Sequence, residues 1–316
     1  MRVVFIVLAA ALLAFSCSTG TEDPVTAGDL IGRVSQDRIE DTIRGLSGAE
    51  AVMIGGSLYT FTTRATGSGE PITKALQYVY ELFESYGLTV EYHPWSGGGY
   101  SCSNVIATRT GTLLPGEIVI ICANLDCVPA SGPAPGADDN ASGCAGVLEC
   151  ARIMSGQSFE RTVRFVLFTG SEQGFLGSGA YADAAADAGD TVTAVYYLRM
   201  IGWDDLGGPV LRLHTRSSPS PGYDGDLTLA DAFSQAAADH SIGVSPVLDA
   251  DGLTTGDHKS FWDHGYSAVC VMEDDVDDFN PHYHMDSDTT DRLNMTYLTN
   301  IVRAVLGTVI GCSGLM

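Results

Sequence analysis

The chain has few basic residues. It contains 16 Lys and Arg against 39 Asp and Glu in 316 residues, for a formal net charge of −23 at pH 7. A chain this acidic is repelled by phosphate backbones, so we expect no nucleic-acid partner. Internal repeats and low-complexity blocks are also missing, and hydrophobic residues make up 45% of the sequence. This composition excludes disorder and predicts a globular chain with a proper core.

Cysteine pairs with metal-ligand or redox spacing are absent as well. No CxxC pair occurs among the eight cysteines, which argues against a zinc-finger or thioredoxin-like site. Seven cysteines follow Cys17, and an odd number leaves at least one thiol unpaired. Cys122 and Cys270 lie inside strand-like apolar runs. We therefore expect most of these thiols to be buried small side chains.

A short apolar run stands at the N-terminus and falls short of a comfortable membrane span. Arg2 precedes the run, Val3–Phe15 forms it, and small residues lead up to Cys17. The pattern is typical of a signal peptide over residues 1–17 and resembles a bacterial lipobox, in which Cys17 becomes a lipidated N-terminus. We expect export to the periplasm or cell envelope, with membrane contact only through the lipid anchor. An ordinary signal peptide is the alternative.

The rest of the chain alternates strand-like and helix-like segments. Apolar, β-branched runs that predict buried strands cover 117–123, 163–169, 192–198 and 268–272. Patterns that predict helices cover 72–86, 142–154, 227–238 and 298–309. The alternation predicts a single α/β domain over 31–316, doubly wound, with a mostly parallel central sheet flanked by helices, after a polar tether at 18–30. Ligands of such sheets bind beyond the carboxyl ends of the strands.

Polar side chains stand where these strands end. Asp139 lies in the loop after the first strand, Glu172 follows the second, and His284 lies near the C-terminus. Two carboxylates and an imidazole that meet with an open fourth position suit a catalytic zinc ion. The alternative is that Asp138 and Asp139 only cap the following helix and that Glu172 is a solvated loop charge.

Four segments together resemble the motifs of the double-zinc aminopeptidases, peptidase family M28. These segments are GADDNASG at 136–143, SEQGFLGS at 171–178, GDHKSF at 256–261 and NPHYHMDSDT at 280–289. The resemblance runs from about Asp37 to Cys312 and implies the zinc-aminopeptidase, phosphorylase/hydrolase-like fold. It also implies that Asp139, Glu172 and His284 hold the first zinc ion, with a peptide bond after Asp139 that is commonly cis.

The resemblance further implies that three functional positions are substituted. The ligand positions of the second zinc hold Asn124 and Arg199, and the general-base position holds Ser171. We therefore expect one zinc ion at most in this site. The Arg199 guanidinium is expected to occupy the vacated position and to pair with Asp139. Exposure of Arg199 to solvent is the alternative.

Other motif residues have supporting roles in the family. Asp126 matches an aspartate that orients metal ligands in the family. We also consider an ion pair between Asp126 and Arg199. Tyr283 matches a hydroxyl that assists the oxyanion in some relatives, and Asp288 matches a position that steadies the loop. Each of these residues could equally be a packed, hydrogen-bonded loop residue.

Two further features receive no place in the expected zinc site. Asp257 and His258 match a family box near the site, but we assign them no ligand role. The acidic run at 273–278 is expected to be a solvated loop, with a calcium site as the alternative.

Three functions fit these residues. The first is a zinc metallopeptidase of this family, an aminopeptidase with weak activity or a changed substrate that acts on the N-terminus of a peptide or protein. The second is a non-catalytic binding module, which the loss of the base at Ser171 favours. The third is different single-zinc chemistry such as glutaminyl cyclisation. Glutaminyl cyclases share the fold and bind one zinc through Asp, Glu and His, but they keep the base Glu.

Overall fold

The computed structural model describes residues 24–128 and 133–316. The expected signal peptide, Cys17 and the first part of the tether lie outside the described residues. Helix α1 (Ala27–Ile31) begins inside the stretch expected as a tether, and the side chain of Leu30 is fully buried. Residues 27–30 therefore belong to the folded part of the chain rather than to a polar tether.

The N-terminal layer consists of two longer helices and a small hairpin. Helix α2 (Gln36–Leu46) precedes the hairpin of β1 (Val52–Ile54) and β2 (Ser57–Tyr59), and α3 (Glu70–Ser85) follows it. The helix predicted at 72–86 is confirmed by α3. Its chain turns away at Gly87, whose φ of 80° suits glycine.

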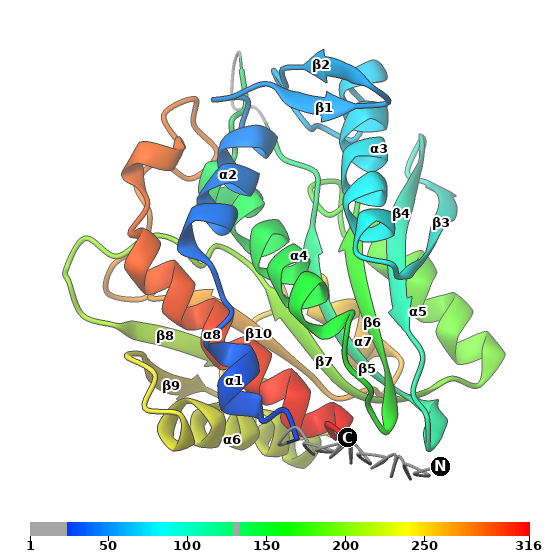
Figure 1. Ribbon diagram of the computed structural model, residues 1–316, viewed down its shortest axis with the longest axis vertical. Coiled ribbons are helices and arrows are strands. Elements are labelled where there is room, and N and C mark those ends of the chain that lie inside the picture. Colours follow the sequence, from blue (N-terminus) through cyan, green and yellow to red (C-terminus); the bar gives the residue numbers. More distant parts are fainter. Residues whose placement is uncertain (1–23, 129–132) are drawn as a thin grey trace, which may run out of the picture.

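Eight strands form one mixed sheet in the order β3–β4–β6–β5–β7–β10–β8–β9 (Figure 1). Their bounds are β3 (Thr89–Gly97), β4 (Tyr100–Arg109), β5 (Leu114–Asn124), β6 (Arg161–Phe168), β7 (Thr191–Leu198), β8 (Val210–His214), β9 (Ser245–Asp249) and β10 (Ala268–Glu273). The central neighbours β6, β5, β7 and β10 run parallel, whereas β4 against β6 and β10 against β8 are antiparallel. The predicted mostly parallel centre is confirmed.

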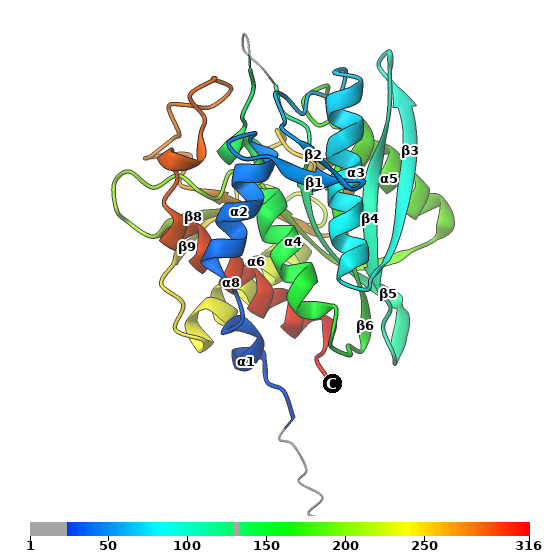
Figure 2. The same cartoon turned by 45° about the horizontal axis from the view of Figure 1, so that its top comes forward.

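Helices cover both faces of this sheet (Figure 1; Figure 2). The added bounds are α4 (Gly143–Met154), α5 (Leu176–Ala188), α6 (Tyr223–Asp239), α7 (His258–Asp263) and α8 (Met295–Ser313). On β5, Val119 and Ile121 pack in the layer of α4 and α8, whereas Ile120 and Cys122 pack in the layer of α5 and α7. Burial on both faces explains why this strand reads as a continuous apolar run.

Two apolar features of the sequence belong to the core. Helix α8 is long and apolar enough to resemble a membrane span, but most of it is buried against α6, α4 and β5. The seven cysteines in the described residues are free thiols, and five of them are buried. The expectation that most cysteines act as buried small side chains is therefore confirmed.

Arg64 is a buried cation that forms hydrogen bonds to three segments of the chain. Its side chain is fully buried, and its guanidinium donates hydrogen bonds of 2.6–2.9 Å to four backbone carbonyls. These belong to Leu46, Leu125, Pro135 and Gly136. The guanidinium thus joins the end of α2 to the loop after β5 and to the entry of the segment that carries Asp139.

We expect Arg64→Ala to lower the free energy of unfolding by about 3 kcal/mol or more, because buried carbonyls would lose their donors. Urea unfolding of the full chain measures this loss. The matched control is Arg292→Ala, whose side chain is 52% exposed. That change should stay within about 0.5 kcal/mol of the native chain. Equal losses in the two variants would contradict the role given to Arg64.

Candidate metal centre and cleft

The carboxyl ends of the parallel strands meet at one edge of the sheet, and the expected site residues follow there. Asn124 ends β5, Ser171 and Glu172 follow β6, and Arg199 follows β7. Asp139 lies in the irregular turn at Ala137–Ser142, directly before α4. The parallel sheet therefore positions the site, as its topology predicts.

Asp139, Glu172 and His284 converge on one point. Each offers a ligand atom, and these atoms lie within 4.8 Å of one another. Nε2 of His284 is 3.1 Å from Oδ2 of Asp139 and 3.5 Å from Oε2 of Glu172. The structure thus brings the three expected ligands together, and the peptide bond after Asp139 is cis, as the resemblance implies.

The donor atoms of this group fit a cation. Within the described part of the chain, both carboxylate oxygens of Asp139 and Nε2 of His284 are buried without a hydrogen-bond partner. Buried polar atoms of native proteins are normally paired, so the gap between these atoms calls for a ligand. Two carboxylates and one imidazole suit zinc. Contacts with Asp139 and then Glu172 raise the pKa of His284 to about 9, so a proton competes with a metal ion for this imidazole.

Asp288 holds the backbone of the segment that carries Asp139. Its two carboxylate oxygens accept hydrogen bonds from the backbone N–H groups of Asp138 and Asp139, at 2.9 and 3.0 Å. Burial raises the pKa of Asp288 to about 7. Asp138 in turn accepts from the backbone N–H of Gly202 and from the amide of Asn280. Asp138 and Asp139 therefore do not act as simple helix caps.

Asp126 is buried and holds the loop that carries Glu172. Its carboxylate accepts a hydrogen bond of 2.8 Å from the Thr66 hydroxyl and longer ones from the backbone N–H groups of Ser171 and Glu172. Burial raises the pKa of Asp126 to about 7. Among the described residues Asp126 forms no ion pair with Arg199, so the pairing considered from the sequence is wrong.

Asn124 is locked in a network of neutral groups. Its side-chain oxygen accepts from the amide of Asn140 at 2.7 Å and from the Tyr197 hydroxyl at 2.8 Å. Its amide nitrogen donates to the backbone carbonyl of Asp126. These bonds engage both the oxygen and the amide nitrogen of the Asn124 side chain.

Arg199 lies in the wall of a cleft of about 220 Å³, together with Ser171, Glu172, Thr255 and Tyr283. Its guanidinium donates to the backbone carbonyl of Thr255 and, at 3.0 Å, to the hydroxyl of Tyr283. No ion pair with Asp139 forms in the described part of the chain, so that expectation is wrong. The solvent-exposed alternative is also wrong, because the side chain is held in the cleft.

Tyr283 contacts both the Arg199 guanidinium and His284, one of the three expected metal ligands. Its ring stacks on the ring of His284, with centroids 3.7 Å apart and planes at 24°. Its hydroxyl accepts from Arg199 and can donate its own proton to a group in the cleft. The geometry is compatible with the oxyanion role that the resemblance implies for Tyr283.

The main residue that sequence reasoning left without a role is Asp257. The hydroxyl of Ser171 donates to its Oδ2 at 2.6 Å, and the carboxyl group is fully buried. Burial raises the pKa of Asp257 to about 6, while the hydrogen bond from Ser171 opposes this shift. The box GDHKSF was the available signal, but only the fold shows that Asp257 contacts the hydroxyl of Ser171.

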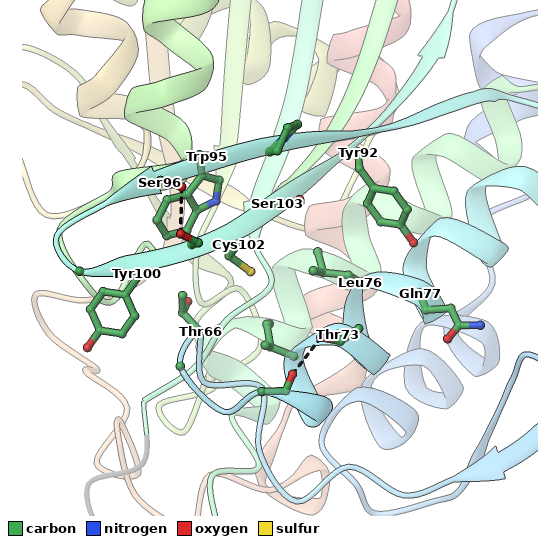
Figure 3. Close-up of a pocket in the computed structure, with 16 residues that line it drawn as sticks. Thr66, Thr73, Leu76, Gln77, Tyr92, Trp95, Ser96, Tyr100, Cys102 and Ser103 are labelled. Carbon is green, nitrogen blue, oxygen red and sulfur yellow. Dashed lines mark hydrogen bonds between the residues drawn. The ribbon is translucent and has the colours of Figure 1, made fainter.

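A wider groove lies beside the cleft rather than around the metal ligands. It encloses about 960 Å³ between α3 and the β3–β4 hairpin, with Leu76 and Gln77 on one wall and Tyr92 and Cys102 on the other (Figure 3). Thr66 lines the groove and also donates to Asp126, so one residue connects the groove to the loop of Glu172.

Comparison with known proteins finds a matching family model and several proteins of similar sequence. The model of Peptidase family M28 matches residues 104–309. The uncharacterized protein YfbL of Escherichia coli (strain K12) is 26% identical over 296 residues, which cover 86% of this chain and 87% of that protein. A probable leucine aminopeptidase 1 of Trichophyton verrucosum is 30% identical over 219 residues, or 65% of this chain and 57% of the relative. The match thus spans little more than half the length of this fungal relative.

Solved structures share the fold. LapB from Legionella pneumophila gives a TM-score of 0.76 at 22% identity, covering 91% of this chain and 74% of that one. An aminopeptidase from Aneurinibacillus sp. strain AM-1 gives 0.71 at 18% identity, covering 92% and 97%. A glutaminyl cyclase of Fimbriiglobus ruber gives 0.69 at 22% identity, covering 88% and 95%. At these identities the likeness concerns the fold alone.

We expect Asp288→Ala to weaken zinc binding by about 10–100-fold, because the segment of Asp139 loses the carboxylate that holds its backbone. Competition with a chromophoric chelator measures the affinity of the full chain. The matched control is Asp286→Ala, an exposed aspartate in the same loop, which should leave the affinity unchanged. Equal affinities in the two variants would show that Asp288 has no positioning role.

Proposed function

Because this chain belongs to peptidase family M28, we propose that it is a zinc-dependent, aminopeptidase-like hydrolase of peptides. The observation that carries the proposal is the convergence of Asp139, Glu172 and His284 with unpartnered buried atoms among the described residues. One zinc ion in this place supplies Lewis-acid activation of a carbonyl group and of water. Asn124 and Arg199 at the other ligand positions support a single ion in this site.

The proton-accepting group is proposed to be Asp257, acting through Ser171. A serine hydroxyl does not titrate near neutral pH, so Ser171 alone is no base. Its hydrogen bond to Asp257 offers a relay: the oxygen of Ser171 takes a proton from the attacking water while its own proton passes to Oδ2 of Asp257. With a pKa of about 6, Asp257 is mostly ionised at pH 7 and can accept that proton.

Arg199 is proposed to set the substrate preference. A fixed guanidinium in a cleft of about 220 Å³ repels a protonated amine and attracts a carboxylate. We expect Arg199 to repel the free α-amino group of the substrate and so to weaken binding and activity. The comparison is with a site that has an aspartate ligand of the second metal ion at this position. Peptides with an acidic N-terminal residue are expected to be the better substrates.

A non-catalytic binding module is the second candidate function, and the specific observation that favours it is Ser171 at the general-base position. In that case the cleft binds the N-terminus of a peptide or protein without cleavage. Glutaminyl cyclisation stays a third candidate, and a peptide with an N-terminal glutamine belongs in the substrate panel for that reason.

The relay is tested by hydrolysis of aminoacyl chromophores with the zinc-loaded full chain. Asp257→Asn keeps an acceptor for Ser171 but cannot take a proton, so we expect kcat to fall by about 100-fold or more with zinc content unchanged. Glu172→Ala should lose zinc and turnover together. The matched control is Asp263→Asn, an exposed aspartate of α7, which should match the native rate.

A native rate in the Asp257→Asn chain would exclude the relay. Absence of turnover in the zinc-loaded native chain would overturn the enzymatic proposal and support the binding module. Ser171→Glu restores a carboxylate at the base position, so this variant should exceed the native kcat if the missing base limits the rate.

The preference is tested with chromogenic glutamyl, leucyl and lysyl substrates. We expect the native chain to favour the glutamyl substrate in kcat/KM and Arg199→Met to lower the glutamyl-to-lysyl ratio by about tenfold, because one cation leaves the cleft. The matched control is Arg292→Met, which removes a surface cation. An unchanged ratio in Arg199→Met would show that Arg199 does not select the substrate.

A further inference from the structure

We propose that His214, Asp249 and Asp275 form a second zinc site, separate from the metal centre of the cleft. Their ligand atoms lie within 4.8 Å of one another. His214 ends β8 and is the register partner of Asp249, which ends the parallel strand β9. Asp275 follows the end of β10, and its Oδ1 lies 3.3 Å from Nε2 of His214. Three elements distant in sequence thus present an imidazole and two carboxylates to one point.

The hydrogen bonds of His214 prepare it as a ligand. Its side chain is 1% exposed, and Nδ1 lies 3.3 and 3.4 Å from the two carboxylate oxygens of Asp251. In the neutral tautomer that donates from Nδ1 to Asp251, Nε2 keeps a lone pair. Zinc-binding histidines are held in this way by a carboxylate on the opposite ring nitrogen.

In that tautomer the lone pair on Nε2 of His214 faces a carboxylate oxygen, which is an acceptor rather than a donor. Nε2 lies 3.3 Å from Oδ1 of Asp275, and in the described part of the chain both atoms are buried without a hydrogen-bond partner. Two acceptors in that position repel each other unless a metal ion or a proton lies between them. The pair is the observation that distinguishes this place from an ordinary acidic surface.

The charge around the pair also favours a cation. Five carboxylates contact either His214 or the neighbouring Arg212, and Arg212 forms ion pairs of 2.8–3.2 Å with three of the five. The carboxylates are Asp249, Asp251, Asp274, Asp275 and Asp277. A carboxylate has two oxygens, so Asp249 can accept from Arg212 and still bind a metal ion. A divalent ion would offset the remaining negative charge.

The donor set selects zinc over calcium. Calcium takes oxygen ligands, whereas an imidazole nitrogen with carboxylates suits zinc. The competing explanation is a second proton on His214, which would bridge Asp251 and Asp275 without any metal. The acidic run at 273–278 is in either case only partly a solvated loop, because Glu273 is fully buried and Asp274 binds Arg212, whereas Val276 and Asp277 are exposed.

A metal ion at this site would restrict the movement of the segment that carries Thr255 and Asp257, which contacts residues of the cleft. Asp251 also accepts from the backbone N–H of Leu253, close to Thr255 and Asp257 in the chain. Thr255 binds Arg199, and Asp257 binds the hydroxyl of Ser171. A metal ion at His214 therefore anchors the segment that supplies these two contacts, which gives it a structural role.

The first test counts zinc by elemental analysis after equilibration with zinc and removal of the excess. The native full chain should hold two equivalents and His284→Ala one. In the His284→Ala background, His214→Ala should hold none. The matched control in that background is His240→Ala, an exposed histidine at the end of α6, which should keep one equivalent. A zinc-free His284→Ala chain would overturn the proposal.

The second test guards against misfolding of the His214 variant. In the His284→Ala background, zinc should raise the Tm of the chelator-treated chain by roughly 5 °C. Asp275→Asn keeps the side-chain shape and should abolish this shift. A full shift in Asp275→Asn, or a shift with calcium in place of zinc, would overturn the site. These readouts are independent of catalysis, so failure of the proposed hydrolase would leave them unchanged.

Discussion

Negative charge gathered behind the carboxyl ends of the parallel strands is the constraint on which the site depends. Each buried carboxyl group there needs a donor, a proton or a cation. Backbone amides serve Asp126 and Asp288, and burial raises the pKa of Glu273 well above its usual value beside Asp138. Among the described residues, Asp139 is left with both oxygens unpartnered. A metal ion held by Asp139 would supply the positive charge that the other carboxyl groups obtain from donors or protons of the protein.

Arg199 introduces a cation of a different kind. A guanidinium cannot be removed by a chelator or by a change of pH, whereas a metal ion exchanges with solution. Arg199 binds the hydroxyl of Tyr283, whose ring stacks on His284. The fixed cation is therefore connected to His284, an expected metal ligand, through one aromatic ring. In the proposed function, this contact would link substrate charge to the geometry of a metal ligand.

The buried centre of the fold could be predicted from the sequence, but its edges could not. Strand β5 was predicted because both of its faces are apolar, whereas β3 alternates exposed and half-buried residues and contains Pro94. The ligands of the cleft were found because a motif surrounds each of them. His214 and Asp275 have no such motif, since only the pairing of β8 with β9 and β10 brings them together. The link from Ser171 to Asp257 is likewise a product of tertiary structure.

The guanidinium of Arg64 has a consequence for the order in which the molecule folds. Its four acceptors come from the end of α2, from the residue after β5 and from the entry to the segment of Asp139. None of these hydrogen bonds is local, so they form only once the N-terminal layer has docked on the sheet. A nascent chain that still lacks this docking would present Asp139 on a loose loop. Capture of a metal ion by Asp139 would therefore follow this docking and would mark completed chains rather than partly folded ones.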